Sequence, residues 1–187
     1  MQNLVSYIFL FIIGSAAGIF MSRHPLLGLL NGLSYVVIFA VNGQNEGSIL
    51  FSICVSVLLM ISITDFKTYE IPVKYNRIIG MLGLVRLMTD PEHWYEYAAG
   101  FFAVSSLLFM MYLISKGKAI GGGDIKLMAA AGLLIGWRDI LLALMIGSVT
   151  ASVIHLILMK LKGKSRVLAF GPYLSFGIFM TMICGNK

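Results

Sequence analysis

Long apolar runs separated by short polar breaks dominate this chain of 187 residues. A helix of roughly 20 apolar residues crosses the hydrocarbon core of a bilayer, and the uncharged run over residues 1–22 meets that length. The pattern predicts an all-α protein, a polytopic bundle of about eight transmembrane helices that forms one domain over residues 1–187. The predicted segments are 1–22, 25–41, 48–64, 78–89, 97–115, 125–137, 140–159 and 167–186.

The composition agrees with a membrane protein. The chain is 59% hydrophobic and 12% charged, with a mean hydropathy of +0.92, which is too apolar for a soluble domain of this size. A net charge of +6 would suggest nucleic acid as the partner of a soluble protein. Here the basic residues interrupt apolar runs, as they do when they set membrane orientation, so we expect a lipid bilayer and no nucleic acid.

Other features predict no cofactor and no metal. Cys54 and Cys184 lie in separate apolar runs without a CxxC pair, and the three histidines are scattered. His155 falls within the seventh run, where a packed or hydrogen-bonded role is expected. The first run has no basic residue before it and no clear cleavage site, so it is interpreted as a retained helix.

The basic residues also test the number of segments, because Lys and Arg prefer cytoplasmic loops. Segments 78–89 and 125–137 are weak. With eight segments and the N-terminus outside, 11 of the 14 basic residues are cytoplasmic, and three (Arg86, Arg138 and Lys187) are outside. Without the two weak segments the division is 9 against 5, so the arrangement with eight is favoured.

This arrangement leaves Asp65, Glu70 and Asp124 as the acidic residues on the cytoplasmic side. Asp65 follows the third segment. Asp124 follows Gly121-Gly-Gly123 and is predicted to be the N-cap of a helix that begins at Ile125. Each aspartate alone would be explained as a helix cap or boundary residue, but together on one face they are interpreted as a functional pair.

Two neighbouring carboxyl groups can hydrolyse a peptide bond with a water molecule. The ionised carboxylate takes a proton from the water, and the protonated carboxyl polarises the carbonyl and supplies a proton to the leaving amine. Like charges held close together cannot both ionise cheaply, which separates the two protonation states. A small proton-coupled transporter and a non-catalytic assembly subunit are the alternatives.

The ordered motifs resemble the type IV prepilin peptidases, bacterial membrane aspartyl proteases of the GxGD type. An aspartate, a basic stretch and Ile-Pro occur as Asp65 to Ile71-Pro72, and GxGDxK occurs as Gly121 to Lys126. Further along, Gly-Trp occurs at 136–137, and Phe-Gly-Pro follows a basic loop at 170–172. The resemblance covers roughly residue 48 to the C-terminus.

The resemblance implies a catalytic role for Asp65 and Asp124, with Gly121, Gly123, Lys126 and Pro72 as supporting motif residues. It implies cleavage of the basic leaders of prepilins or pseudopilins, as in type IV pilus or type II secretion systems, at the cytoplasmic face of the bacterial inner membrane. Many family members insert a domain with two CxxC pairs after the first span. Here Arg23-His24-Pro25 leads directly into the second run, so a short form without N-methyltransferase activity is expected, and a bifunctional enzyme is the alternative. The oligomeric state is left open.

Overall fold

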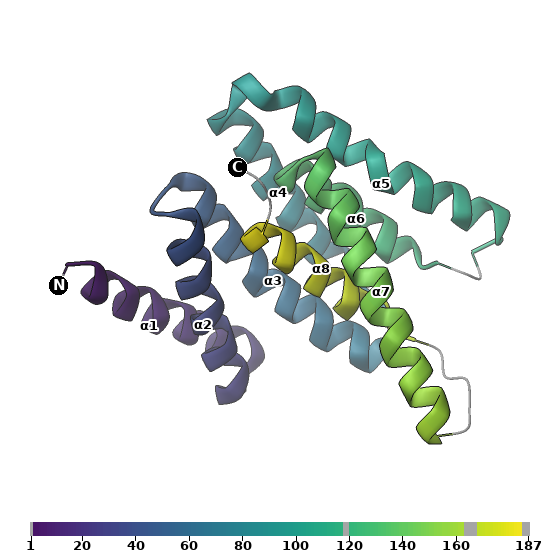
Figure 1. Cartoon of the computed structure of the whole chain (residues 1–187), viewed down its shortest axis with the longest axis horizontal. Coiled ribbons are helices and arrows are strands. Elements are labelled where there is room, and N and C mark those ends of the chain that lie inside the picture. Colours follow the sequence, from purple (N-terminus) through teal and green to yellow (C-terminus); the bar gives the residue numbers. More distant parts are fainter. Residues whose placement is uncertain (1, 118–119, 163–167, 185–187) are drawn as a thin grey trace. The chain divides into compact units, whose positions relative to one another are not determined.

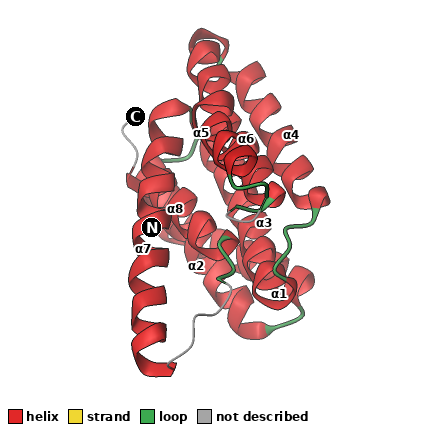
Figure 2. Cartoon of the chain, turned by 90° about the vertical axis from the view of Figure 1, so that its right-hand side faces the viewer, coloured by secondary structure: helices red, strands yellow, loops and turns green. Residues whose placement is uncertain are grey.

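The computed structural model describes residues 2–117, 120–162 and 168–184, and the regular elements in these ranges are helices (Figure 2). Their bounds are α1 Gln2–Ser22, α2 Pro25–Asn42, α3 Glu46–Thr68, α4 Val73–Thr89, the 3-10 helix η1 Pro91–His93, α5 Trp94–Ile114, α6 Gly122–Ile135, α7 Trp137–Lys162 and α8 Gly171–Cys184. The all-α prediction is confirmed. The chain divides into two compact units, Met1–Met60 and Ile61–Lys187.

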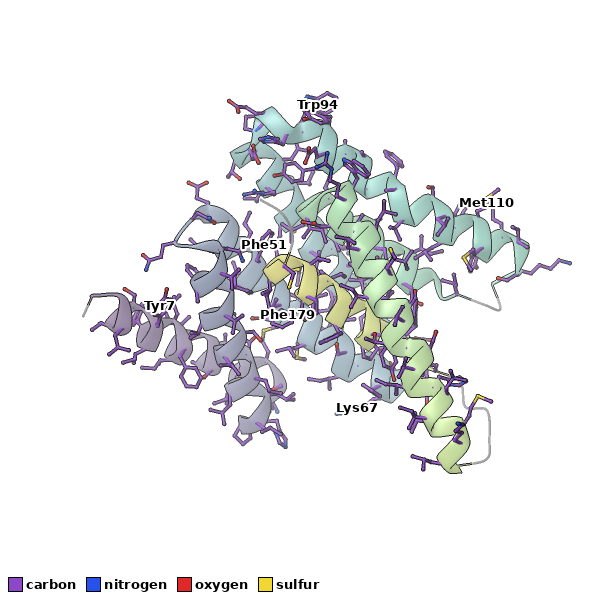
Figure 3. The ribbon with its side chains drawn as sticks, in the orientation of Figure 1. Tyr7, Phe51, Lys67, Trp94, Met110 and Phe179 are labelled. Carbon is purple, nitrogen blue, oxygen red and sulfur yellow. The ribbon has the colours of Figure 1, made fainter. Side chains whose placement is uncertain are left out.

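Most of the described helices are suited to a membrane. Five segments are long and apolar enough to cross it: Leu4–Ser22, Pro25–Asn42, Glu46–Thr68, Pro91–Ile114 and Trp137–Leu161. Apolar side chains cover their outer surfaces. On α5, for example, Trp94 and Met110 project outward (Figure 3) with 57% and 65% of their surface exposed. The chain is therefore a multi-pass membrane protein.

Three of the eight α-helices in the described ranges are shorter. α4 has 17 residues, and α6 and α8 have 14 each. A helix of 14 residues is about 21 Å long, which is less than the roughly 30 Å of a hydrocarbon core. The eight predicted segments thus exist as helices, and the two that looked weak in the sequence, α4 and α6, are among the short ones.

In the first unit, small residues allow α1 and α2 to pack closely. A Cβ atom on Gly14 would lie 2.9 Å from the Cα of Gly32, and one on Gly18 would lie 2.8 Å from the Cα of Gly28. The buried amide of Asn31 donates to the Gly14 carbonyl and to Ser56 Oγ, at 2.9 Å in both cases. Small residues and buried polar groups hold membrane helices together in this way.

The second unit is built around α6, which packs against α4, α5, α7 and α8 (Figure 1). Nine of its 14 residues are buried. The backbones of α5 and α6 touch where Gly100 meets Gly132, and Gly177 of α8 meets the Ala143 carbonyl of α7. A short helix enclosed on several sides provides a rigid base for the residue at its N-terminal end, which is Asp124.

Candidate active site

Asp65 lies in the last turn of α3, which continues to Thr68. The prediction that the helix ends before Asp65 was wrong by one turn, because Phe66, Lys67 and Thr68 keep helical geometry although they are exposed. The helix ends where Tyr69 takes a left-handed φ of 55° and its N–H bonds to the Asp65 carbonyl at 2.9 Å. The carboxyl of Asp65 points inward, and the residue is only 4% exposed.

Asp124 is the third residue of α6, and Gly121 is the N-cap. The prediction that Asp124 caps a helix starting at Ile125 was therefore wrong, because Gly122 and Gly123 already adopt helical geometry. The Asp124 N–H bonds to the Gly121 carbonyl at 3.2 Å, which closes the first turn. Asp124 is 8% exposed, so both aspartates of the predicted pair are buried.

The three glycines before Asp124 differ in what surrounds them. A Cβ atom on Gly121 would lie 3.1 Å from Asp124 Oδ2, and one on Gly123 would lie 2.9 Å from the Cβ of Ile71. A Cβ on Gly122 would meet nothing within 4 Å. A side chain is therefore excluded at positions 121 and 123 and tolerated at position 122, which is a physical reason for the spacing Gly-x-Gly-Asp.

Gly171, the first residue of α8, contacts Asp65 directly. Its N–H donates to Asp65 Oδ2 at 2.9 Å, and a Cβ atom at this position would lie 2.9 Å from the same oxygen. Pro172 follows within the first turn of α8, where a proline costs no hydrogen bond. The Phe-Gly-Pro motif thus brings a backbone donor to Asp65, a role that sequence reasoning did not assign.

Ile71 lies between the two aspartate-bearing segments. The loop between α3 and α4 has four residues, 69–72, and is much shorter than the 13 residues (65–77) that separate the predicted segments 48–64 and 78–89. This short loop folds inward and places Ile71, which is 8% exposed, against both Gly123 and Gly171. Asp65 and Asp124 are thereby brought within electrostatic reach of each other.

Asn76 is a second polar residue that the sequence analysis missed. It lies in the first turn of α4, is 6% exposed, and its Nδ2 donates to the Gly123 carbonyl at 3.2 Å. This bond fixes the orientation of the amide, and the other end, Oδ1, is buried without a partner in the described part of the chain. Asn76 therefore ties α4 to the residue immediately before Asp124.

The remaining predicted residues lie at the edge of the site. Pro72 is the N-cap of α4, and its carbonyl accepts the N–H of Tyr75 at 3.1 Å. Lys126 lies on α6 with its side chain exposed, and it forms no ion pair with either aspartate within the described ranges. The same ranges contain no group of three His, Cys, Asp or Glu side chains placed to hold a metal ion.

The site therefore consists of two buried carboxyl groups from segments 59 positions apart (65 to 124). Asp65 accepts a backbone N–H from Gly171, Gly121 lies beside Asp124, and neither carboxyl forms an ion pair with a cation within the described ranges. Neighbouring carboxyls in such a setting share protons, and one ionised and one protonated group can serve as general base and general acid. The pair titrates as a unit.

Comparisons with known proteins found a matching family over the part of the chain that holds both aspartates. The family model described as Type IV leader peptidase family matches residues 52–156, a range that includes Asp65, the three glycines and Asp124. No solved structure is significantly similar to the chain.

Three of the similar sequences share the name prepilin leader peptidase/N-methyltransferase. The protein from Legionella pneumophila is 35% identical over 92 residues, which is 48% of this chain and 32% of the relative. The protein from Aeromonas salmonicida strain A449 is 25% identical over 175 residues, 89% of this chain and 60% of the relative. The protein from Escherichia coli K12 is 28% identical over 131 residues, which is 67% of this chain and 58% of the relative. The chain thus spans at most about 60% of the length of these relatives.

Proposed function

Because the chain belongs to the type IV leader peptidase family, we propose that it is a membrane aspartyl endopeptidase that removes the short basic leader of prepilins or pseudopilins. This is the same family that the ordered sequence motifs resemble. The name that these relatives share supports the substrate class.

One observation carries the proposal. Asp65 and Asp124 lie in different helices and are only 4% and 8% exposed. They are within electrostatic reach of each other. Neither forms an ion pair with a cation within the described ranges. Burying two unpaired carboxyls lowers stability, and such groups are retained where their proton chemistry is used. A role as helix caps does not explain them, because neither residue occupies a cap position.

In the proposed mechanism a water molecule between the carboxyls attacks the carbonyl carbon of the scissile bond. The ionised carboxylate accepts the proton that the water loses, and the protonated carboxyl donates to the carbonyl oxygen. This carboxyl polarises the carbonyl through a hydrogen bond and keeps its proton until collapse of the tetrahedral intermediate breaks the C–N bond, when it supplies the proton to the leaving amine. The Gly171 N–H holds Asp65 in place at 2.9 Å, and the excluded side chains at 121 and 123 keep Asp124 in position.

We place this site at the cytoplasmic face of the bacterial inner membrane. The support is the charge distribution, in which 11 of 14 basic residues fall on the side of Asp65 and Asp124. The short helices α6 and α8 both begin at the site. A substrate whose apolar helix lies in the bilayer would meet the carboxyls where that helix ends and the leader begins.

The test is cleavage of a co-expressed prepilin by the wild type and by Asp65→Asn and Asp124→Asn. Each variant is expected to lose at least about 100-fold in rate while remaining inserted in the membrane, because general acid and base groups contribute that much. Asp139→Asn on α7 makes the same chemical change outside the site and serves as the control. Cleavage retained in either site variant would contradict the mechanism and favour a transporter or a non-catalytic assembly subunit.

The same experiment tests N-methylation, the second activity in the relatives' name. In this chain two residues, Arg23 and His24, separate α1 from α2, and no CxxC pair is present. We therefore propose peptidase activity alone. An added methyl group in the intact mass of the wild-type product would overturn that part of the proposal.

A further inference from the structure

The middle of α7 carries a polar stripe that the proposed mechanism does not use. Ser148, Ser152 and His155 are spaced by four and three residues, which places them on one face of the helix. Together with Ala151 of α7 and with Leu168 and Phe170 of the segment before α8, they line a cavity of about 350 Å³. That volume is at the lower end of the range of small-molecule sites.

This cavity, which we call the α7 groove, adjoins the aspartate pair. Phe170 lines the groove, and the next residue, Gly171, donates its N–H to Asp65 Oδ2 at 2.9 Å. The Phe170 carbonyl also accepts the N–H groups of Tyr173 and Leu174, both at 3.1 Å. The wall of the groove and the donor to Asp65 therefore belong to one ordered turn.

Polar side chains are costly in a helix that spans a membrane, and by default they indicate a function. The Ser152 hydroxyl donates a hydrogen bond to the Ser148 carbonyl at 2.8 Å. Its oxygen can therefore accept a hydrogen bond from a ligand. His155 is half-buried, and no hydrogen bond to it occurs within the described ranges.

The chemistry of the lining indicates the occupant. Among the described residues that line it, the groove has hydroxyls and an imidazole but no acidic or permanently charged side chain, so these residues offer a metal ion or a phosphate no counter-charge. A lipid chain needs no polar partner, and a helical peptide bonds its own backbone. An extended peptide in a membrane must find partners for its N–H and C=O groups, and a peptide bond must be extended to reach a catalytic pair.

We propose that the α7 groove binds the extended backbone of the substrate next to the scissile bond. This inference rests on the proposed peptidase function and names a binding subsite for it. Ser148, Ser152 and His155 supply hydrogen bonds to the peptide backbone, and Phe170 sets the distance between the groove and Asp65.

Site-specific photo-cross-linking in the full chain tests this proposal. A photoreactive residue is placed at 152 or 155, and at 153 or 156 as matched controls. Val153 and Leu156 are 50% and 60% exposed and do not line the groove. The probe is a synthetic prepilin peptide with its leader and first apolar residues, and an Asp124→Asn background keeps it uncleaved. Cross-links at 152 and 155 that exceed those at 153 and 156 at least fivefold are expected.

Kinetics of an otherwise wild-type chain provide the second measurement. His155→Leu is expected to raise KM about tenfold with little change in kcat, because it removes a contact that substrate and transition state share. Thr150→Val is the control, since Thr150 bonds to the Ile146 carbonyl of its own helix at 2.8 Å and lies outside the groove.

The outcomes separate the two proposals. Equal cross-linking at all four positions, cross-linking to lipid alone, or an unchanged KM in His155→Leu would overturn the groove while wild-type cleavage still supported the peptidase. Selective cross-links at 152 and 155 without wild-type cleavage would support a peptide site and overturn the peptidase.

Discussion

Two carboxylate regions at opposite ends of α4 contrast sharply in how their charges are treated. Beyond the C-terminal end, Asp90 accepts a hydrogen bond from the Tyr97 hydroxyl at 2.6 Å, contacts His93 Nδ1 at 2.8 Å and pairs with Arg86 at 3.6 Å. Before the N-terminal end, Asp65 and Asp124 have backbone donors, and neither forms an ion pair with a cation within the described ranges. The 17 residues of α4 separate the two regions by about 25 Å.

The contrast distinguishes a structural carboxylate from a functional one. Asp90 is held ionised by its neighbours: the Tyr97 hydroxyl, then the His93 ring and Arg86, lower the pKa of its carboxyl below the ordinary value. A carboxylate held in this way stabilises the fold and exchanges protons poorly. Asp65 and Asp124 are more deeply buried and lack such partners, an arrangement that lowers stability and makes proton transfer between them and a substrate feasible.

The largest expected effect tests the functional end of α4 through the glycines before Asp124. Gly123→Ala is expected to reduce prepilin cleavage at least about 100-fold, because its Cβ would lie 2.9 Å from the Cβ of Ile71, and a displacement of about 1 Å at a catalytic group costs that much. Gly122→Ala, whose Cβ would meet nothing within 4 Å, is the matched control. The measurement is the cleavage rate of purified protein at equal folded amounts. Equal losses in both variants would show that helix propensity, and not the contact with Ile71, determines the effect.

The sequence predicted this region unevenly. Apolar runs predicted the helices, and the positive charges placed Asp65 and Asp124 on the same side of the membrane, because both signals are local and additive. Gly171 and Asn76 were missed as site residues, since their roles depend on contacts 106 and 47 positions away in sequence. The end of α3 and the start of α6 were misplaced because polar residues and glycines stay helical here although their intrinsic propensities suggest a boundary, and propensity is only a weak guide.

The next effect tests whether Asn76 belongs to the functional end of α4. Asn76→Leu is expected to lower kcat about tenfold with KM nearly unchanged, because it removes the bond at 3.2 Å that fixes the Gly123 carbonyl beside Asp124. Folding should be little affected, since the unpartnered Oδ1 is removed as well. The control is Asn45→Leu, which loses an amide bond of 2.8 Å to the Asn42 carbonyl in the α2–α3 turn. A matching loss of thermal stability in Asn76→Leu would instead indicate a purely structural residue.

A substitution at the opposite end of α4 should change the stability of the protein and leave its cleavage rate unchanged. Asp90→Asn is expected to lower the free energy of unfolding at neutral pH by about 1 kcal/mol, as for a partly exposed charged hydrogen-bond network. Because the folded pKa of Asp90 is lowered, its contribution is present above the ordinary carboxyl pKa of about 4 and is lost as the pH falls through the folded value. Wild type and Asp90→Asn should therefore converge in strong acid.

That convergence is measured by denaturant unfolding in detergent as a function of pH. The prepilin cleavage rate of Asp90→Asn should match that of the wild type at neutral pH. A difference in stability that persists at acid pH would assign the effect to packing at Asp90, and a lost activity would mean that the two ends of α4 are not independent.

The smallest expected effect concerns Lys126, the exposed motif lysine on the turn after Asp124. Lys126→Ala is expected to change kcat/KM by about threefold or less, because exposed charges without a close partner contribute little. Lys67→Ala removes another exposed lysine, from the end of α3 (Figure 3), and is the control for a general loss of positive charge. A selective loss of tenfold or more in Lys126→Ala, restored by Lys126→Arg, would mean that a cation does act on the aspartate pair. In that case the functional end of α4 would hold its charge as the Asp90 end does, and the absence of a partner could no longer explain why these two carboxyls react.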